Sequence, residues 1–293
     1  MRKINIVEVG PRDGFQNICD FISTETKLNV IDAIAKAGVK HIQVTSFVNP
    51  KAIPQMKDAK TVAEVCKERY SDIEISALTP NLRGVDDAVA AGITNLSYVI
   101  SLSESHNKAN VRKTRDESIA ELEKVLKKYP SIHLTLDLAT TFGCPFEGIY
   151  TTDQVVHFVD RLVSIGVKDI NLCDTVGLAN PQQVRNIVSQ VISKYPQIKF
   201  QIHIHDTRGM GLVNTLAGIE AGIDYVQSTL GGLGGCPFAP GASGNTSTED
   251  LVYMLNEMNF DTGIQFSRLL AAAKYEYKMI QGNYSGHHLH IEK

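Results

Sequence analysis

The sequence predicts an α/β fold in which eight parallel strands alternate with helices and close into one barrel. Strand-like apolar runs alternate with helix-length amphipathic segments, and a short glycine-containing motif recurs where a helix should end and a strand begin. The repeat of about 22–38 residues suits one strand and one helix per unit, and no linker rich in proline or serine interrupts it. A (β/α)8 TIM barrel satisfies all three observations, and an open sheet of roughly six to eight strands is the alternative.

The strands are expected, in chain order, at short runs of alternating or continuous apolar residues, a pattern typical of strands buried in a sheet. Between the first two runs, the segment STETKLNVIDAIAKAG places Leu28, Ile31 and Ile34 at helical spacing, which predicts an amphipathic helix. Segments of similar length separate the later runs. The eight runs begin near Ile4, His41, Ile73, Leu96, His133, Asp169, Phe200 and Tyr225.

The recurring motif appears as AGVKHI, AGITNL, IGVKDI and AGIDYV. Its glycine suits the position just after a helix, where a positive φ is needed and only glycine is unstrained. We therefore expect helices to end immediately before Gly38, Gly92, Gly166 and Gly222.

Length and composition favour a single catalytic domain over residues 1–293, with the barrel at about 1–260 and a C-terminal helical segment at about 261–293. A net charge of −3 provides no field that would attract nucleic acid or an anionic membrane. No apolar run approaches the ~18 residues of a membrane span. The five cysteines are scattered, without a CxxC pair, so a reducing cytoplasmic location is expected rather than a disulfide framework.

The stretch QIHIHD predicts a metal site, because residues two apart on a strand share a face and His203 and His205 would stand side by side. In a barrel of this kind, chemistry occurs at the carboxyl ends of the strands, where Asp13 also falls. Two imidazoles with oxygen ligands suit Mg²⁺ or Mn²⁺; zinc in an open catalytic site is the alternative.

Two glycine-containing segments accompany these residues. In EVGPRDGFQN, a turn after the first strand would place Arg12 beside Asp13 at the barrel mouth, where a fixed guanidinium could stabilise an enolate; a plain surface ion pair is the alternative. GGLGGCPFAPGASGN follows the last strand and is interpreted as a lid or a close backbone approach to a ligand. Its Cys236 is either a buried hydrophobe or a proton carrier.

These segments, together with TSFVNPKAIPQM, LTPNLRG, FGCPFEG, DTVG, HIHDTRGMGLVNTL and TEDLVYML, resemble the 3-hydroxy-3-methylglutaryl-CoA lyase family over nearly the whole chain. The resemblance implies a metal-dependent retro-Claisen cleavage of a CoA thioester to acetoacetate and acetyl-CoA. It also implies a homodimer and a role in leucine degradation and ketone-body-type metabolism. The glycine loop with its cysteine disfavours the related synthases that condense acetyl-CoA with a 2-oxoacid.

Carried over residue by residue, the resemblance implies metal ligands at Asp13, His203, His205 and Asn245 and a supporting Glu249. It implies enolate stabilisation by Arg12, an acid/base or positioning role for Asp174, and proton handling by Cys236. Substrate contacts are expected from Arg12, Gln16, Thr45 and Asn81. The family's strand-2 glutamate is replaced by Gln43, so three interpretations stay open: a slow lyase, a lyase with a shifted substrate, or a non-lyase. Cys173, where the family usually has glycine, is a second difference.

Overall fold

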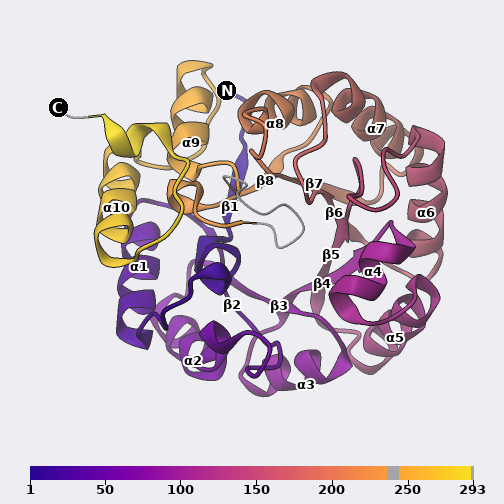
Figure 1. Cartoon of the computed structure of the whole chain (residues 1–293), viewed down its shortest axis with the longest axis horizontal. Helices are drawn as coiled ribbons and strands as arrows, with labels where there is room; N and C mark the ends of the chain where they lie inside the picture. Colours follow the sequence, from indigo (N-terminus) through magenta and orange to yellow (C-terminus); the bar gives the residue numbers. More distant parts are fainter. Residues whose placement is uncertain (236–243, 292–293) are drawn as a thin grey trace.

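The structure is a computed structural model that describes residues 1–235 and 244–291. Eight parallel strands pair in chain order, and the barrel closes because β8 pairs with both β7 and β1. Figure 1 shows the ring of strands enclosed by helices. The strands are β1 (Asn5–Glu8), β2 (His41–Ser46), β3 (Glu74–Thr79), β4 (Asn95–Ser101), β5 (His133–Ala139), β6 (Asp169–Asp174), β7 (Lys199–Ile204) and β8 (Tyr225–Ser228).

Helices connect successive strands, and the β4–β5 connection contains two of them, separated at Arg112, which adopts a left-handed conformation with φ 58°. Single turns of helix lie at Gly10–Gly14, Phe15–Asn17, Pro54–Met56, Leu230–Gly232 and His287–His290. The longer helices are α1 (Thr24–Lys36), α2 (Ala59–Arg69), α3 (Leu82–Ala90), α4 (Glu104–Val111), α5 (Arg115–Lys128), α6 (Thr152–Ser164), α7 (Pro181–Lys194), α8 (Gly211–Glu220), α9 (Thr248–Glu257) and α10 (Phe266–Met279).

The predicted barrel and its helix ends are confirmed. Gly38, Gly92, Gly166 and Gly222 follow α1, α3, α6 and α8 with φ values of 103°, 81°, 98° and 119°. These values lie where a side chain is strained, which explains the glycine in each repeat of the motif. The closed ring of strands excludes the open-sheet alternative.

The interior of the barrel contains polar side chains, although such interiors are usually filled by branched apolar residues. Gln43 donates to Ser97 (Nε2 to Oγ, 2.8 Å), and Gln201 donates to Asp169 (Nε2 to Oδ1, 2.9 Å). Apolar residues of the strands, such as Ile42 and Ile202, are fully buried and belong to the main hydrophobic core. This polar interior forms the floor beneath the carboxyl ends of the strands.

The C-terminal part of the chain packs α10 beside α1 and α9 and then returns to the carboxyl end of β8 (Figure 1). The backbone N–H groups of Ser285 and Gly286 both donate to the carbonyl of Gly231. Asp250 at the start of α9 accepts hydrogen bonds from the backbone N–H groups of His287 and His288. Within the described residues, no helix is long and apolar enough to cross a membrane.

Candidate functional site

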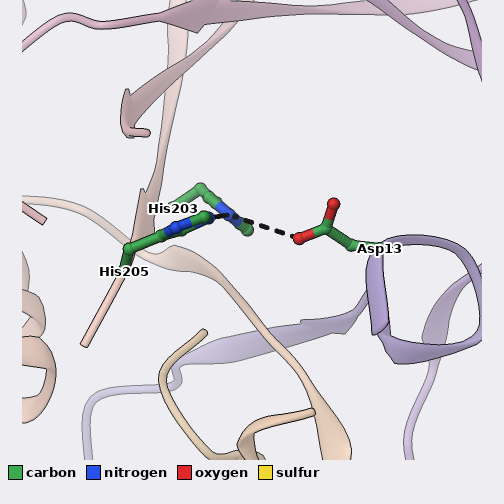
Figure 2. Close-up of side chains that lie close together, drawn as sticks. All are labelled: Asp13, His203 and His205. Atoms are coloured by element: carbon green, nitrogen blue, oxygen red, sulfur yellow. Dashed lines mark hydrogen bonds and ion pairs between the residues drawn. The ribbon is translucent and has the colours of Figure 1, made fainter. Parts of the chain in front are cut away.

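The centre of the site is a cluster of Asp13, His203 and His205, whose potential ligand atoms all lie within 4.8 Å of one another. Figure 2 shows both imidazoles directed toward the Asp13 carboxylate. The two Nε2 atoms are 3.1 Å apart, and Nε2 of His203 lies 3.9 Å from Oδ2 of Asp13. The period-two placement on β7 therefore produces the side-by-side histidines that the sequence predicts.

Burial determines the charge state of this cluster. Desolvation by burial lowers the pKa of His203 to about 3, and it also lowers the pKa of His205. Burial alone would raise the pKa of Asp13, but the Arg12 guanidinium and the hydrogen bond from Asn245 hold it below its usual value. Two neutral imidazoles thus face one carboxylate, the protonation state in which these groups bind metals.

Asn245 reaches the same carboxylate from the segment that follows β8. Its Nδ2 donates to Oδ2 of Asp13 at 2.8 Å and to the carbonyl of Leu233 at 3.3 Å. An isolated backbone bridge also joins His205 to Asn245. Hydroxyl Oγ of Ser285, 3.4 Å from the Asn245 carbonyl, adds support from the C-terminal segment. The four predicted metal ligands are therefore neighbours, although residues 13 and 245 lie far apart in sequence.

The donor set fits a divalent cation. Nδ1 of His203, Nδ1 of His205 and Oδ1 of Asn245 are buried and lack a hydrogen-bond partner among the described residues. A mixed set of imidazole nitrogens and oxygens, with no thiolate among the described members, is typical of Mg²⁺ or Mn²⁺ and is compatible with catalytic zinc. The chemistry of these residues thus supports the metal that the sequence predicts.

Arg12 is held in position by two neighbours, Asp13 and Gln43. Its Nη1 lies 2.5 Å from Oδ1 of Asp13, and its Nε donates to Oε1 of Gln43, whose own Nε2 donates to Ser97. Gln16 donates to Oδ1 of Asp13 at 2.8 Å. Glycine is required at Gly10, because a side chain there would approach Oε1 of Glu8 to 2.6 Å. This network fixes the guanidinium beside the metal cluster, as a charge-stabilising group requires.

Three of the other predicted residues make local contacts instead. Both carboxylate oxygens of Asp174 accept backbone N–H bonds, from Leu178 at 2.9 Å and Ala179 at 3.1 Å, and burial raises its pKa to about 6. Asn81 caps α3 by accepting from the backbone N–H of Gly84. Thr45 is buried with Oγ1 3.6 Å from the sulfur of Met56. The structure joins none of the three directly to the metal cluster, and their functional roles stay predictions.

Glu249 supports the backbone near the end of β8, since its Oε2 accepts from the N–H of Gly231 at 2.9 Å. Glu8 also supports this backbone, since it accepts hydrogen bonds from the N–H groups of Gly10 and Leu230 and from the hydroxyl of Thr248. Sequence reasoning missed Glu8, although a carboxylate inside the apolar run INIVEV could have indicated a buried functional residue. Desolvation by burial raises the pKa of both glutamates to about 7.

Cys236 lies outside the described residues, so its predicted role as a proton carrier stays a prediction. Cys173 is a buried free thiol on β6, and burial together with the Asp137 carboxylate raises its pKa. Asp137 on β5 was also missed: it is buried in the barrel interior and accepts a hydrogen bond from Asn171 (Nδ2 to Oδ1, 2.8 Å). A carboxylate within the otherwise apolar strand HLTLDLA could have indicated this residue from the sequence.

Comparison with known proteins agrees with this geometry. The sequence model of the HMGL-like family matches residues 3–275. The chain belongs to the HMGL-like family. It is 41% identical over 281 residues to hydroxymethylglutaryl-CoA lyase YngG of Bacillus subtilis, covering 95% of this chain and 94% of the relative.

Two solved HMG-CoA lyases have the same fold. The B. subtilis enzyme superimposes with a TM-score of 0.93 and 39% identity, covering 99% of this chain and 97% of that one. The enzyme from Acinetobacter baumannii, solved with coenzyme A and 3-methylmalate, has a TM-score of 0.90 and 39% identity, covering 96% of this chain and 92% of that one. The resemblance noted from the sequence motifs is therefore confirmed, and the chain is a member of a family of lyases.

Proposed function

We propose that this HMGL-like protein cleaves 3-hydroxy-3-methylglutaryl-CoA, or a close 3-hydroxyacyl-CoA, to acetoacetate or the matching 3-oxoacid and acetyl-CoA. The observation that carries the proposal is the convergence of Asp13, His203, His205 and Asn245 beside the fixed guanidinium of Arg12. High identity to HMG-CoA lyases over nearly the full length supports the same reaction. The alternative of an acetyl-CoA condensing acyltransferase has no comparable support.

The cleavage requires one base for the C3 hydroxyl proton and one acid for C2, while the remaining electrons move within the substrate. The C3 hydroxyl loses its proton and becomes a carbonyl while the C2–C3 bond breaks and its electron pair goes to C2. Arg12 is placed to stabilise the resulting thioester enolate, because Gln43 and Asp13 hold its guanidinium rigidly. C2 then takes a proton, a step that the resemblance assigns to Cys236. Asp174 stays the candidate acid/base or positioning carboxylate.

Asp13, His203, His205 and Asn245 would hold the divalent cation, with Mg²⁺ or Mn²⁺ as the proposed ion. When bound, such an ion supplies Lewis acidity to the oxygen atoms of the substrate. The chain's contribution is to keep both imidazoles neutral and the Asp13 carboxylate ionised. Gln16, which donates to Asp13, would orient this carboxylate and adjoin the substrate.

The direct test incubates the purified protein with Mg²⁺ or Mn²⁺ and a panel of 3-hydroxy-3-alkylglutaryl-CoA esters while acetyl-CoA is measured. We expect cleavage, its loss after chelation of the metal, and recovery when Mg²⁺ or Mn²⁺ is added back. A protein with bound metal that cleaves none of the esters would contradict the proposal. Release of free CoA from acetyl-CoA and a 2-oxoacid would favour the acyltransferase instead.

A variant separates metal binding from folding. Asp13→Asn removes the charged ligand, so we expect Mn²⁺ affinity to fall at least about tenfold by isothermal titration calorimetry. Asp160→Asn, at an exposed aspartate paired with Lys194 on the outside of the barrel, is the matched control and should bind Mn²⁺ as the unmodified protein does. Equal affinities for the two variants would remove Asp13 from the ligand set.

The proposal extends to the organisation of the protein. It comprises one catalytic domain over residues 1–293, a homodimer, and a role in leucine degradation and ketone-body-type metabolism. The free thiols of Cys19, Cys66, Cys144 and Cys173 suit a reducing compartment such as the cytoplasm. Light scattering coupled to size-exclusion chromatography tests the dimer: a mass near twice the 32.1 kDa of the chain is expected.

A further inference from the structure

Asp137 is a buried carboxylate in the barrel interior that the cleavage mechanism does not use. It lies on β5 inside the barrel, and the charges of Arg12 and Asp13 act on its carboxylate. Its backbone neighbour across the sheet is Asn171, and the next interior residue of β6, Cys173, is in register with His203. Asp137 and a predicted metal ligand therefore flank the same thiol.

Asp137 is buried but not completely enclosed. Asp137, Arg12, Asp13, Cys173 and His203 each keep between 5% and 8% of their surface exposed, whereas Asn171 keeps none. Oδ1 of Asp137 accepts a hydrogen bond from Asn171. Its other oxygen, Oδ2, accepts no hydrogen bond from any residue in the part of the chain that the structure describes. One acceptor thus stays available to a ligand.

The inferred binding mode keeps the bulk of coenzyme A at the mouth of the barrel and the thioester beside Arg12. In this mode the far end of the acyl chain, beyond C3, is directed toward the polar floor. Asp137 is a carboxylate of that floor, in register with Asn171, which lies two residues before Cys173 on β6.

We propose that Asp137 contacts the inner end of the acyl chain and selects a hydroxyl group there in preference to a carboxylate. This inference rests on the proposed lyase function and names its substrate class: 3-hydroxyacyl-CoA esters with a second hydroxyl at the far end of the acyl chain. A terminal carboxylate would be repelled by Asp137, the charged group placed at this end of the acyl chain. A hydroxyl donates to the free oxygen without this penalty.

The reaction of such a substrate is balanced without a further reactant. For 3,5-dihydroxy-3-methylpentanoyl-CoA, the C2–C3 bond breaks, its electron pair goes to C2, and the C3 hydroxyl gives up its proton as the ketone forms. Protonation of C2 gives acetyl-CoA, and the ketone is 4-hydroxybutan-2-one. This ester differs from 3-hydroxy-3-methylglutaryl-CoA only by a terminal CH2OH in place of the carboxylate, so the two form a matched pair.

The test compares kcat/KM for these two esters, first with the unmodified protein. We expect the dihydroxy ester to be preferred by about tenfold or more, the range of a hydrogen bond to a charged acceptor. Asp137→Asn, which is nearly isosteric, should lower this preference by about tenfold or more, whereas a purely structural role would affect both esters equally. Asp160→Asn changes the same residue type on the outer helices, where Asp160 pairs with Lys194, and should leave the preference unchanged.

The outcomes distinguish the two proposals. Efficient cleavage of 3-hydroxy-3-methylglutaryl-CoA with no preference for the dihydroxy ester would overturn the role of Asp137 and leave the lyase function standing. An Asp137→Asn protein with an unchanged preference would do the same. Absence of acetyl-CoA from both esters would overturn the lyase function and this inference together. The comparison on the unmodified protein decides the matter even if Asp137→Asn fails to fold.

Discussion

At the scale of single residues, the site is organised around the Asp13 carboxylate, which is shared among several partners. Its Oδ1 atom pairs with the Arg12 guanidinium and accepts a hydrogen bond from Gln16. Its Oδ2 atom accepts a hydrogen bond from Asn245 and faces His203. Each partner constrains the position of the others, so the arrangement is determined before any ligand arrives. Preorganisation of this kind reduces the reorganisation that accompanies charge development during the reaction.

Gln43 provides a direct test of how firmly Arg12 is held. Gln43→Glu would replace the neutral acceptor for Nε of Arg12 with a charged one, and Ser97 could donate to the second oxygen. Because charge-assisted hydrogen bonds are about twice as strong as neutral ones, we expect turnover of 3-hydroxy-3-methylglutaryl-CoA to rise by roughly three- to tenfold.

Steady-state kinetics at saturating metal measure this effect. Ser97→Ala, which removes only the hydroxyl that accepts from Gln43, is the companion variant and should not raise turnover. An unchanged rate in Gln43→Glu would argue against a slow lyase and would favour a shifted substrate among the three interpretations of this position.

At the scale of elements, the glycine that follows a helix sets the angle at which the chain enters the next strand. Gly166 after α6 and Gly38 after α1 have nearly the same φ, 98° and 103°. Their surroundings differ: a methyl group at Gly166 would meet no atom within 4 Å, whereas at Gly38 it would lie 2.8 Å from the carbonyl oxygen of Gly263. Backbone strain and steric clash can therefore be measured separately.

We expect Gly166→Ala to lower the free energy of unfolding by about 1 kcal/mol, the cost of holding a side chain in this region of φ. Gly38→Ala should lower it further, because the Gly263 backbone must also move. Urea denaturation of both variants measures the difference. Equal losses would show that the turn at Gly263 yields freely to the added methyl group.

The sequence predicts these elements well because their signals are local. A period of two on β7 is enough to place His203 and His205 on one face, and the glycine of each repeat marks a helix end. The role of an oxygen-bearing side chain is harder to predict. Asp174 and Asn81 carry the right groups at the right ends of strands, yet both bond to nearby backbone N–H groups.

Asp137 was missed for a related reason. Polar residues facing a barrel interior resemble polar residues facing solvent when only the sequence is considered, since both alternate with apolar neighbours. The pairing of β5 with β6 shows that this carboxylate faces Asn171 in the interior. Contacts between strands, unlike helix ends, depend on residues far apart in the sequence.

At the scale of the whole molecule, three buried glutamates join the first strand to the last helices. Desolvation by burial raises the pKa of Glu276 on α10 well above its ordinary value, and repulsion from Glu8 and Glu249 adds to this shift. The folded protein therefore retains protons that the unfolded chain releases. The contribution of these glutamates to the free energy of unfolding is therefore largest at acid pH. It is lost as the pH rises toward about 7, the pKa of Glu8 and Glu249 in the folded protein.

Glu276→Gln should consequently stabilise the protein more at pH 8 than at pH 5, because glutamine is neutral at both pH values and nearly isosteric with protonated glutamate. Thermal unfolding measures the effect, and we expect a difference of a few degrees between the two shifts in Tm. Glu257→Gln, at an exposed glutamate ending α9, is the control without pH dependence. The same shift at both pH values would show that Glu276 is ionised in the folded state.

The closure of the barrel also orders events during synthesis of the protein. β1 pairs with β8, and Asp13 meets Asn245 across 232 positions of the chain. While the polypeptide is being made, the first ligand emerges from the ribosome long before the last one is translated. A cation held by the proposed ligands would therefore meet all four of them only once synthesis has passed Asn245, so metal loading would be a late step in the maturation of this protein.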